Sequence, residues 1–221
     1  MKVLELFAGS RSFSKVAESL GHETYCTDIE SFEGIDQVCD IFKFDMNKVP
    51  FKPDIIWASP PCTYFSVASI GHHWNKDHTP KTKQAVLGVK IVAETLRIIK
   101  NLNPEYFYIE NPRGKLRKLD IMTNEPFFRK TVTYCSFGDS RMKPTDIWTN
   151  DFRWIPRAMC HNGNRDCHHE PAPRGSRTGT QGMDSAYEKS KVPADLCKEI
   201  LNGIERHHKK RSDLYETPIS D

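Results

Sequence analysis

The chain has 221 residues, of which 38% are hydrophobic, and its formal net charge is +3. It has no apolar run near the roughly 18 residues that a membrane-spanning helix needs, so a membrane protein is excluded, and its length fits one domain. Seven scattered cysteines, an odd number, do not resemble a secreted disulfide framework. With no signal peptide at Met1, they favour a soluble protein in the cytoplasm.

Strand and helix patterns alternate through the first half of the chain, which predicts an α/β fold with a largely parallel sheet. The expected strands are residues 2–7, 23–27, 37–41, 54–59 and 105–110, followed by 130–136 and 145–149. Apolar residues at helical spacing predict helices at 12–20 and 82–102, and a closing helix that opens at Pro193.

Three regions follow from this pattern. Residues 1–150 form the expected catalytic core, and residues 188–221 a C-terminal helix that returns to the core and ends in a basic tail. Between them, residues 151–187 are rich in Arg, Gly, Pro, His and Cys and show neither period, so we expect an irregular insert.

Two short motifs carry most of the chemistry, and each follows an apolar run that reads as a buried strand. The first is Ser59-Pro60-Pro61-Cys62, and the second begins at Glu110. A thiolate can add to an electron-poor ring while an acid supplies the proton that makes the ring a better acceptor. Methylation of cytosine at ring carbon 5 requires this pair of groups.

A third motif, Phe7-Ala8-Gly9-Ser10, connects the first strand to the first helix. Small residues there let backbone amides approach a ligand at the carboxyl end of the sheet. Asp28, at the end of the second strand, can accept hydrogen bonds from ribose hydroxyls. Asp40, at the end of the third, can accept from an adenine amino group.

Together these motifs resemble those of the cytosine-5 DNA methyltransferase family. The resemblance implies a Rossmann-like sheet flanked by helices, S-adenosylmethionine as cofactor and DNA, duplex or single-stranded, as partner. It implies Cys62 as the nucleophile, Glu110 as the acid and Arg141 as a third catalytic residue. The implied cofactor residues are Phe7, Ala8, Gly9, Ser10, Asp28, Ile29, Asp40, Ile41 and Pro60.

Substrate contacts are expected from Ser66, Asn111 and Lys143 within these motifs. Lys143 stands for an arginine of the family, and Arg11 follows the turn where the family has further glycines, so it could reach the methionine carboxylate. Arg174 and Arg177, in a basic glycine-rich stretch, are further candidates for substrate contact.

The insert is too short for the family's target-recognition domain, which indicates a compact, phage-like member with low sequence selectivity. The same chemistry on RNA or a free nucleotide is an alternative, as is a non-catalytic DNA-binding protein that keeps the fold. Amino-group methylation is disfavoured because Cys62 stands where those enzymes have an aromatic residue.

Two further features could serve a ligand. Cys160, Cys167 and His168 are packed densely enough in the insert to bind zinc, although their spacing matches no standard finger. Arg113, Lys115, Arg117 and Lys118 crowd the loop after Glu110 and could meet phosphates.

Overall fold

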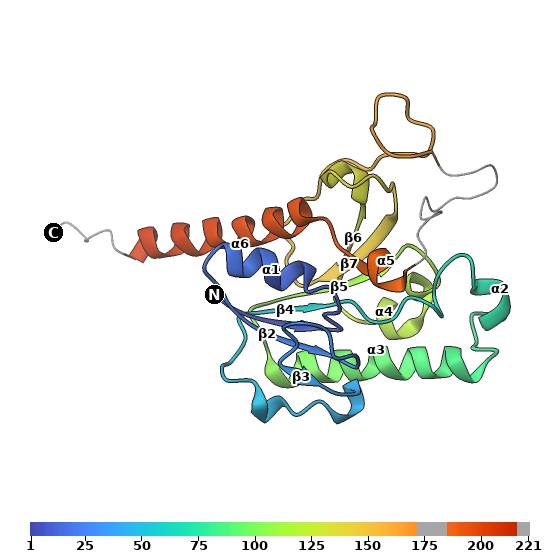
Figure 1. The fold of residues 1–221 in the computed structure, drawn as a ribbon, viewed down its shortest axis with the longest axis horizontal. Coiled ribbons are helices and arrows are strands. Elements are labelled where there is room, and N and C mark those ends of the chain that lie inside the picture. Colours follow the sequence, from blue (N-terminus) through green and yellow to red (C-terminus); the bar gives the residue numbers. More distant parts are fainter. Residues whose placement is uncertain (172–184, 216–221) are drawn as a thin grey trace.

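A seven-stranded mixed sheet forms the centre of the protein (Figure 1). The computed structural model describes residues 1–171 and 185–215. The strand order is β3-β2-β1-β4-β5-β7-β6. The first five strands are parallel, β7 runs antiparallel to both β5 and β6, and β6 therefore runs in the same direction as β5. The strands are β1 (Lys2–Leu6), β2 (Glu23–Asp28), β3 (Gln37–Val38), β4 (Ile55–Ala58), β5 (Tyr106–Pro112), β6 (Phe128–Thr133) and β7 (Pro144–Thr149). The predicted α/β fold with a largely parallel sheet is confirmed.

Helices cover both faces of the sheet. Helices α1 and α6 lie together on one face, and the long α3 lies on the other (Figure 1). The α-helices are α1 (Ser12–Ser19), α2 (Ile70–His73), α3 (Lys83–Leu102), α4 (Asp120–Thr123), α5 (Ala186–Ser190) and α6 (Ala194–Tyr215). Four short 3-10 helices are η1 (Ile41–Lys43), η2 (Met46–Lys48), η3 (Leu116–Lys118) and η4 (Tyr134–Phe137).

The central strand β4 is apolar along its whole length because both of its faces are covered. Successive side chains of a strand point to opposite faces. Thus Ile55 and Trp57 of β4 pack in the core beneath α1 and α6, whereas Ile56 and Ala58 pack in the core beneath α3. The strands therefore cannot slip by one residue without turning their side chains to the wrong layer.

Register brings the sequence motifs to one edge of the sheet. Leu6 of β1 pairs with Ala58 of β4, and Ala58 pairs with Ile109 of β5. The next residues along the three neighbouring strands are Phe7, Ser59 and Glu110. The turns that carry the three motifs consequently start side by side at the carboxyl end of the parallel strands.

Element boundaries differ from the predictions where a tight turn replaces strand. Residues 37–41 are strand only at Gln37–Val38, because the Asp40 carboxylate caps η1 by accepting from the backbone N–H of Phe42 at 3.1 Å. The strand expected at 130–136 begins at Phe128 and gives way to η4 at Tyr134. The predicted helix at 82–102 is correct, with Thr82 as its N-cap.

The segment from residue 150 to residue 171 contains no helix or strand, and the next element along the chain, within the described residues, is α5. None of the helices in the described part of the chain is long and apolar enough to cross a membrane.

Candidate active site

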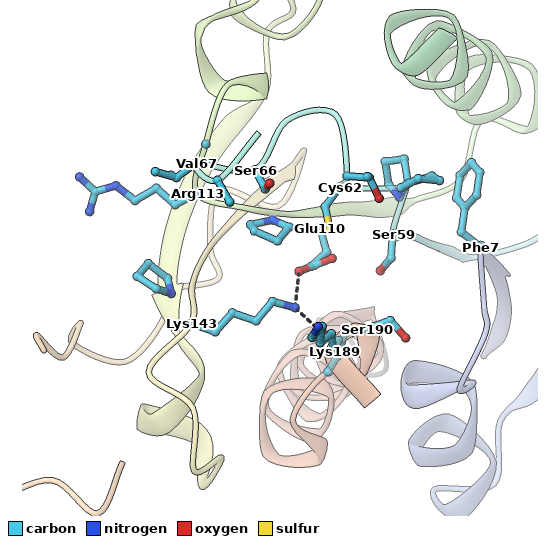
Figure 2. A pocket seen from close by; sticks show the side chains of 18 of the residues that line it. Phe7, Ser59, Cys62, Ser66, Val67, Glu110, Arg113, Lys143, Lys189 and Ser190 are labelled. Carbon is cyan, nitrogen blue, oxygen red and sulfur yellow. Dashed lines mark hydrogen bonds and ion pairs between the residues drawn. The ribbon is translucent and has the colours of Figure 1, made fainter. Parts of the chain in front are cut away.

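A cavity of about 980 Å³ opens at the carboxyl ends of β1, β4 and β5 (Figure 2). Eight of the residues predicted from sequence line it: Phe7, Ala8, Ser10, Pro60, Cys62, Ser66, Glu110 and Lys143. Its remaining wall includes Lys189 and Ser190, at the end of α5, and Val192, which lies between α5 and α6. Residues from both ends of the sequence thus close one space.

The loop that carries Cys62 is held by backbone contacts. Asn111 is fully buried, and its Nδ2 donates to the carbonyl oxygen of Pro60 at 2.9 Å. The carbonyl of Cys62 accepts the backbone N–H groups of Phe65 at 2.9 Å and Ser66 at 3.0 Å, so the chain turns back immediately after the cysteine. Asn111 does not line the cavity, and its observed contact positions the loop that presents the sulfur.

The backbone at Gly114 packs closely against this loop. The backbone N–H of Lys115 donates to the carbonyl oxygen of Phe65 at 2.7 Å, and a Cβ added to Gly114 would collide with that same oxygen. The position therefore requires glycine because two backbone segments approach closely there.

Glu110 is buried at the end of β5 and faces the cavity (Figure 2). Its Oε1 accepts a hydrogen bond from the hydroxyl of Tyr134 at 2.8 Å and lies 3.8 Å from Nζ of Lys143. Lys143 Nζ also donates to the carbonyl of Lys189 at 3.1 Å and lies 4.6 Å from the centre of the Tyr134 ring. One carboxylate oxygen is thus fixed by two neighbours.

The pKa of the Cys62 thiol is raised above its ordinary value. Burial is the largest cause, and the negative charge of Glu110 acts in the same direction, whereas the positive charge of Lys143 lowers the pKa. Burial and Glu110 therefore favour the neutral thiol of Cys62. The positive charge of Lys143 favours the thiolate.

Arg141, expected as a third catalytic residue, does not line the cavity. Its guanidinium is buried and bound to Asp139, and it donates to the carbonyls of Glu188 and Lys189 at 3.2 Å and of Lys191 at 3.0 Å. It fixes the chain between α5 and α6, which in turn forms one wall of the cavity. Lys143, two residues later, is the cation that faces the cavity.

The turn after β1 forms the other end of the cavity. Phe7 has a left-handed backbone conformation, with φ of 58°, and Gly9 has φ of 45°. An aromatic residue rarely adopts this conformation, and such strained residues concentrate at functional sites. Figure 2 shows the Phe7 ring beside Ser59, on the same side of the cavity wall.

The other predicted cofactor residues lie outside the cavity lining. Asp28 accepts the backbone N–H of Gly9 at 2.8 Å and that of Glu30 at 3.0 Å, so it orders the turn from the neighbouring strand. Ile29 is 64% exposed, an unusual state for a large apolar side chain. Asp40 is exposed and caps η1, and Ile41 is buried in the core.

Arg11 also differs from its expectation. Its guanidinium pairs with Glu18 and contacts the sulfur of Cys26 at 3.4 Å, and it does not line the cavity. The methionine carboxylate is therefore not its partner in this conformation.

Glu5 is a functional candidate that the sequence analysis missed. It lies within β1, is buried, and lines the cavity. Its carboxylate accepts the backbone N–H groups of Phe13 at 3.3 Å and Ser14 at 2.8 Å, at the first turn of α1, where a negative charge is favourable. Burial raises the pKa of this carboxyl. An acid inside an otherwise apolar strand was the available signal.

The basic loop after Glu110 divides into two groups. Arg113, Arg117 and Lys118 line the cavity, and Arg117 also pairs with Asp146 at 2.7 Å. Lys115 is buried instead, with its Nζ 2.7 Å from Nδ1 of His78 and over the ring of Trp74. Arg174 and Arg177 lie outside the described residues.

The predicted zinc ligands are partly wrong. Cys160 and Cys167 do lie together, but their neighbours are Cys135 and His169. The ring of His168 instead has its Nε2 3.0 Å from the carbonyl oxygen of Asp139.

The sheet order, with a cavity at the carboxyl ends of its parallel strands, defines a Rossmann-like methyltransferase fold. Residues 1–123 match the family model described as C-5 cytosine-specific DNA methylase. The chain belongs to this family, and its class of enzyme is DNA (cytosine-5)-methyltransferase. A "Probable DNA (cytosine-5)-methyltransferase" of Frog virus 3 (isolate Goorha) is 29% identical over 175 residues, which cover 76% of this chain and 78% of the relative.

Two solved structures resemble the chain distantly. A protein described as a candidate DNA modification methyltransferase, encoded within an E. coli prophage, has a TM-score of 0.48 and 15% identity over 67% of this chain and 46% of its own. A mutant of Spodoptera frugiperda DNMT2 has a TM-score of 0.43 and 18% identity over 73% and 57%. The chain thus spans about half the length of these two proteins, and these likenesses are too weak to add to the assignment.

Proposed function

We propose that this protein transfers a methyl group from S-adenosylmethionine to ring carbon 5 of cytosine in DNA, with Cys62 as nucleophile and Glu110 as acid. The observation that carries the proposal is the meeting of these two side chains in one cavity. Cys62 lies in the loop after β4, and Glu110 lies near the end of the adjacent parallel strand β5. Membership of the C-5 cytosine-specific DNA methylase family supports the same chemistry.

In the proposed reaction the Cys62 thiolate adds to carbon 6 of the cytosine. Glu110 donates a proton to ring nitrogen 3, so that electron density moves to carbon 5, which then takes the methyl group. Water then accepts the proton of carbon 5, the bond from carbon 6 to sulfur breaks to release the Cys62 thiolate, and the proton on nitrogen 3 returns to Glu110, which restores the ring. Because Tyr134 and Lys143 both contact Oε1 of Glu110, the carboxylate is held in one orientation for this task.

The residues around Phe7 fit the cofactor. S-adenosylmethionine supplies the methyl group when it is bound. Phe7 offers a ring to an adenine, Asp28 a half-exposed carboxylate to ribose hydroxyls, and Ile29 an apolar side chain that has no place in the core. A Cβ added to Gly9 would meet only the side chains of Asp28 and Ser190, at 3.8 and 3.9 Å, so the turn leaves room beside the cavity.

DNA is the proposed substrate class. The exposed cations Arg113 and Lys118 stand at the cavity and suit contacts with phosphates. The half-buried thiol of Cys62 lies within a cavity and cannot reach a base that is stacked in a helix, so the target cytosine of a duplex substrate must be flipped out. Arg174 and Arg177 remain predicted contacts of the same kind.

The decisive experiment is covalent trapping. The protein is incubated with S-adenosylmethionine and an oligonucleotide that contains 5-fluorocytosine, and adduct is measured on a denaturing gel. We expect adduct with the parent and with Cys39→Ser, a variant of another half-buried cysteine, and none with Cys62→Ser. Adduct with Cys62→Ser would refute the nucleophile.

The same assay separates the alternatives. Oligonucleotides of duplex DNA, single-stranded DNA and RNA, and free dCMP, are compared with labelled cofactor, followed by nucleoside analysis. Labelled 5-methylcytosine in DNA supports the proposal. Transfer confined to RNA or to dCMP, or DNA binding without transfer, would each replace it.

A further inference from the structure

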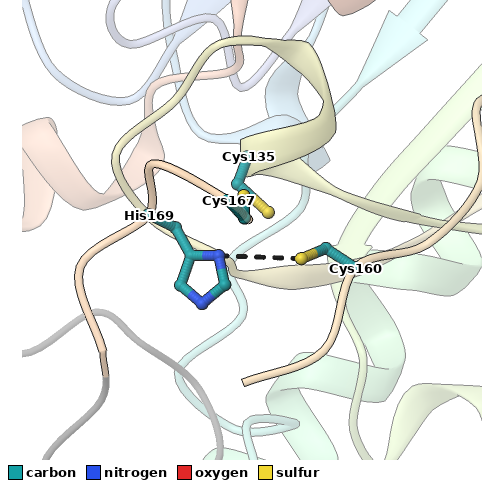
Figure 3. Close-up of side chains that lie close together, drawn as sticks. All are labelled: Cys135, Cys160, Cys167 and His169. Carbon is teal, nitrogen blue, oxygen red and sulfur yellow. Dashed lines mark hydrogen bonds between the residues drawn. The ribbon is translucent and has the colours of Figure 1, made fainter. Parts of the chain in front are cut away.

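Four potential metal ligands meet where the irregular segment 150–171 touches the core. They are Cys135 of η4 and Cys160, Cys167 and His169 of that segment (Figure 3). Their ligand atoms all lie within 4.8 Å of one another, and Cys135 and His169 are buried. Cys135 lies 25 positions before Cys160, so the sequence spacing alone did not reveal the set.

The distances suit tetrahedral zinc. With Zn–S near 2.3 Å and Zn–N near 2.05 Å, a tetrahedral ion holds a sulfur and a nitrogen about 3.6 Å apart. Sγ of Cys160 lies 3.6 Å from Nδ1 of His169. Three sulfurs and one imidazole nitrogen are a ligand set of closed, structural zinc sites.

Few apolar contacts hold this segment in place. Among residues 155–171 of the described chain no aliphatic side chain is buried, and Ile155 and Met159 are 82% and 44% exposed. A segment without an apolar core needs another source of stability. Metal coordination is such a source, because the free energy of metal binding stabilises the folded segment directly. Three thiols cannot all be paired in disulfides with one another, and all three cysteines here are free.

The surroundings orient the ligands as a zinc site requires. Nδ2 of Asn164 donates to Sγ of Cys160 at 3.4 Å, a contact that suits a metal-bound thiolate. The backbone N–H of Cys160 donates to the Thr133 hydroxyl at 2.8 Å, which anchors the ligand to the end of β6. The chain returns through a turn at Gly163, where φ is 82°.

We propose that Cys135, Cys160, Cys167 and His169 bind one structural zinc ion. The site fastens the irregular segment to the core beside the active site. Cys135 directly follows Tyr134, whose hydroxyl binds Glu110, and His168 contacts the carbonyl of Asp139, the residue paired with Arg141. Loss of the ion therefore loosens residues that support the cavity from outside, namely Tyr134 behind Glu110 and the Asp139–Arg141 pair behind α5.

Metal content tests the proposal independently of activity. The full chain is purified without added metal or chelator, and zinc is measured by elemental analysis. We expect about one zinc per chain. Protein stripped of metal and titrated with Co²⁺ should bind one equivalent and show the intense visible band of tetrahedral cobalt with thiolate-to-metal charge transfer.

A neighbouring pair of histidines provides the matched control. His169→Ala should weaken zinc in competition with a chelator by more than about tenfold, since loss of even an outer partner of a ligand costs about 10–100-fold. His168→Ala should leave the affinity within about twofold, because its ring contacts a backbone carbonyl. Cys135→Ser should abolish the charge-transfer band of the Co²⁺ form or reduce it by about one third, in line with the loss of one of three thiolates.

Two results would overturn the site. One is parent protein that contains no stoichiometric zinc and, after treatment with reductant, takes up no Co²⁺ with thiolate bands. The other is zinc that is retained by His169→Ala and lost by His168→Ala. Because the Co²⁺ titration uses the parent chain, a variant that fails to fold does not remove the test.

Discussion

Replacing Gly114 with alanine probes the support of the catalytic loop. The added Cβ would collide with the carbonyl oxygen of Phe65, which is a backbone atom and cannot rotate away as a side chain could. One of the two segments must move, and the hydrogen bond from the N–H of Lys115 to that oxygen, now 2.7 Å, is lost or stretched. Phe65 is fully buried, so the displacement is transmitted to the turn that begins at Cys62.

The expected cost follows from three contributions. Overpacking costs about 1–3 kcal/mol, and a buried backbone acceptor left without its partner costs about 1–3 kcal/mol. The reduced freedom of the unfolded chain returns about 0.4–1 kcal/mol. The net loss is about 1–6 kcal/mol in the free energy of unfolding, or a Tm lower by about 2–22 °C for a chain of this size.

Thermal and urea unfolding measure this loss, with Gly71→Ala as the control. Gly71 lies in α2 with nothing within 4 Å of an added Cβ, so alanine there should leave the stability unchanged or raise it by up to about 1 kcal/mol. Gly114→Ala should also reduce the rate of covalent trapping at temperatures where it remains folded. Equal Tm values for the parent and Gly114→Ala would refute the close approach of the two backbones.

Three further predictions concern the cavity. The rate at which iodoacetamide alkylates Cys62 should rise with pH and reach half its maximum above the pH typical of a free thiol. Lys143→Met should raise the pH of that midpoint, and Glu110→Gln should lower it. Shifts of both variants in the same direction would contradict the assigned charges. Asp28→Ala should weaken S-adenosylmethionine binding by roughly 1.5–3 kcal/mol in calorimetry, and unchanged affinity would remove Asp28 from the cofactor site. Arg141→Gln should slow methyl transfer and increase proteolysis between α5 and α6. The pH midpoint of Cys62 alkylation should stay nearly unchanged. A shift of that midpoint as large as the shift in Lys143→Met would place Arg141 in the cavity.

The fold was predictable because its signals are local. Apolar runs that end at Phe7, Ser59 and Glu110 mark buried parallel strands, and parallel strands must present their carboxyl ends at one edge. The closing helix was visible from Pro193. The predicted strand boundaries were wrong where a side chain competes with the hydrogen bonds between strands. At Asp40 the carboxylate caps a 3-10 helix, so the strand ends earlier than predicted.

The site was predictable only in its linear motifs. Cys62 and Glu110 stand in short patterns, whereas the hydroxyl that holds Glu110 belongs to Tyr134, 24 positions later, with no motif of its own. Likewise Arg141 and Lys143 are two apart and chemically alike, and the backbone decides which one faces the cavity. His168 and His169 pose the same problem, since neighbouring side chains point in different directions.

The cavity joins parts of the chain that lie far apart in the order of synthesis. The backbone N–H of Val192 donates to the hydroxyl of Ser12 at 3.1 Å, across 180 positions, and both residues line the cavity. During translation the turn after β1 is therefore made long before the segment that precedes α6. A nascent chain that has not yet reached residue 192 has Cys62 and Glu110 but lacks one wall around them. Synthesis of this late segment thus decides when the thiol becomes enclosed.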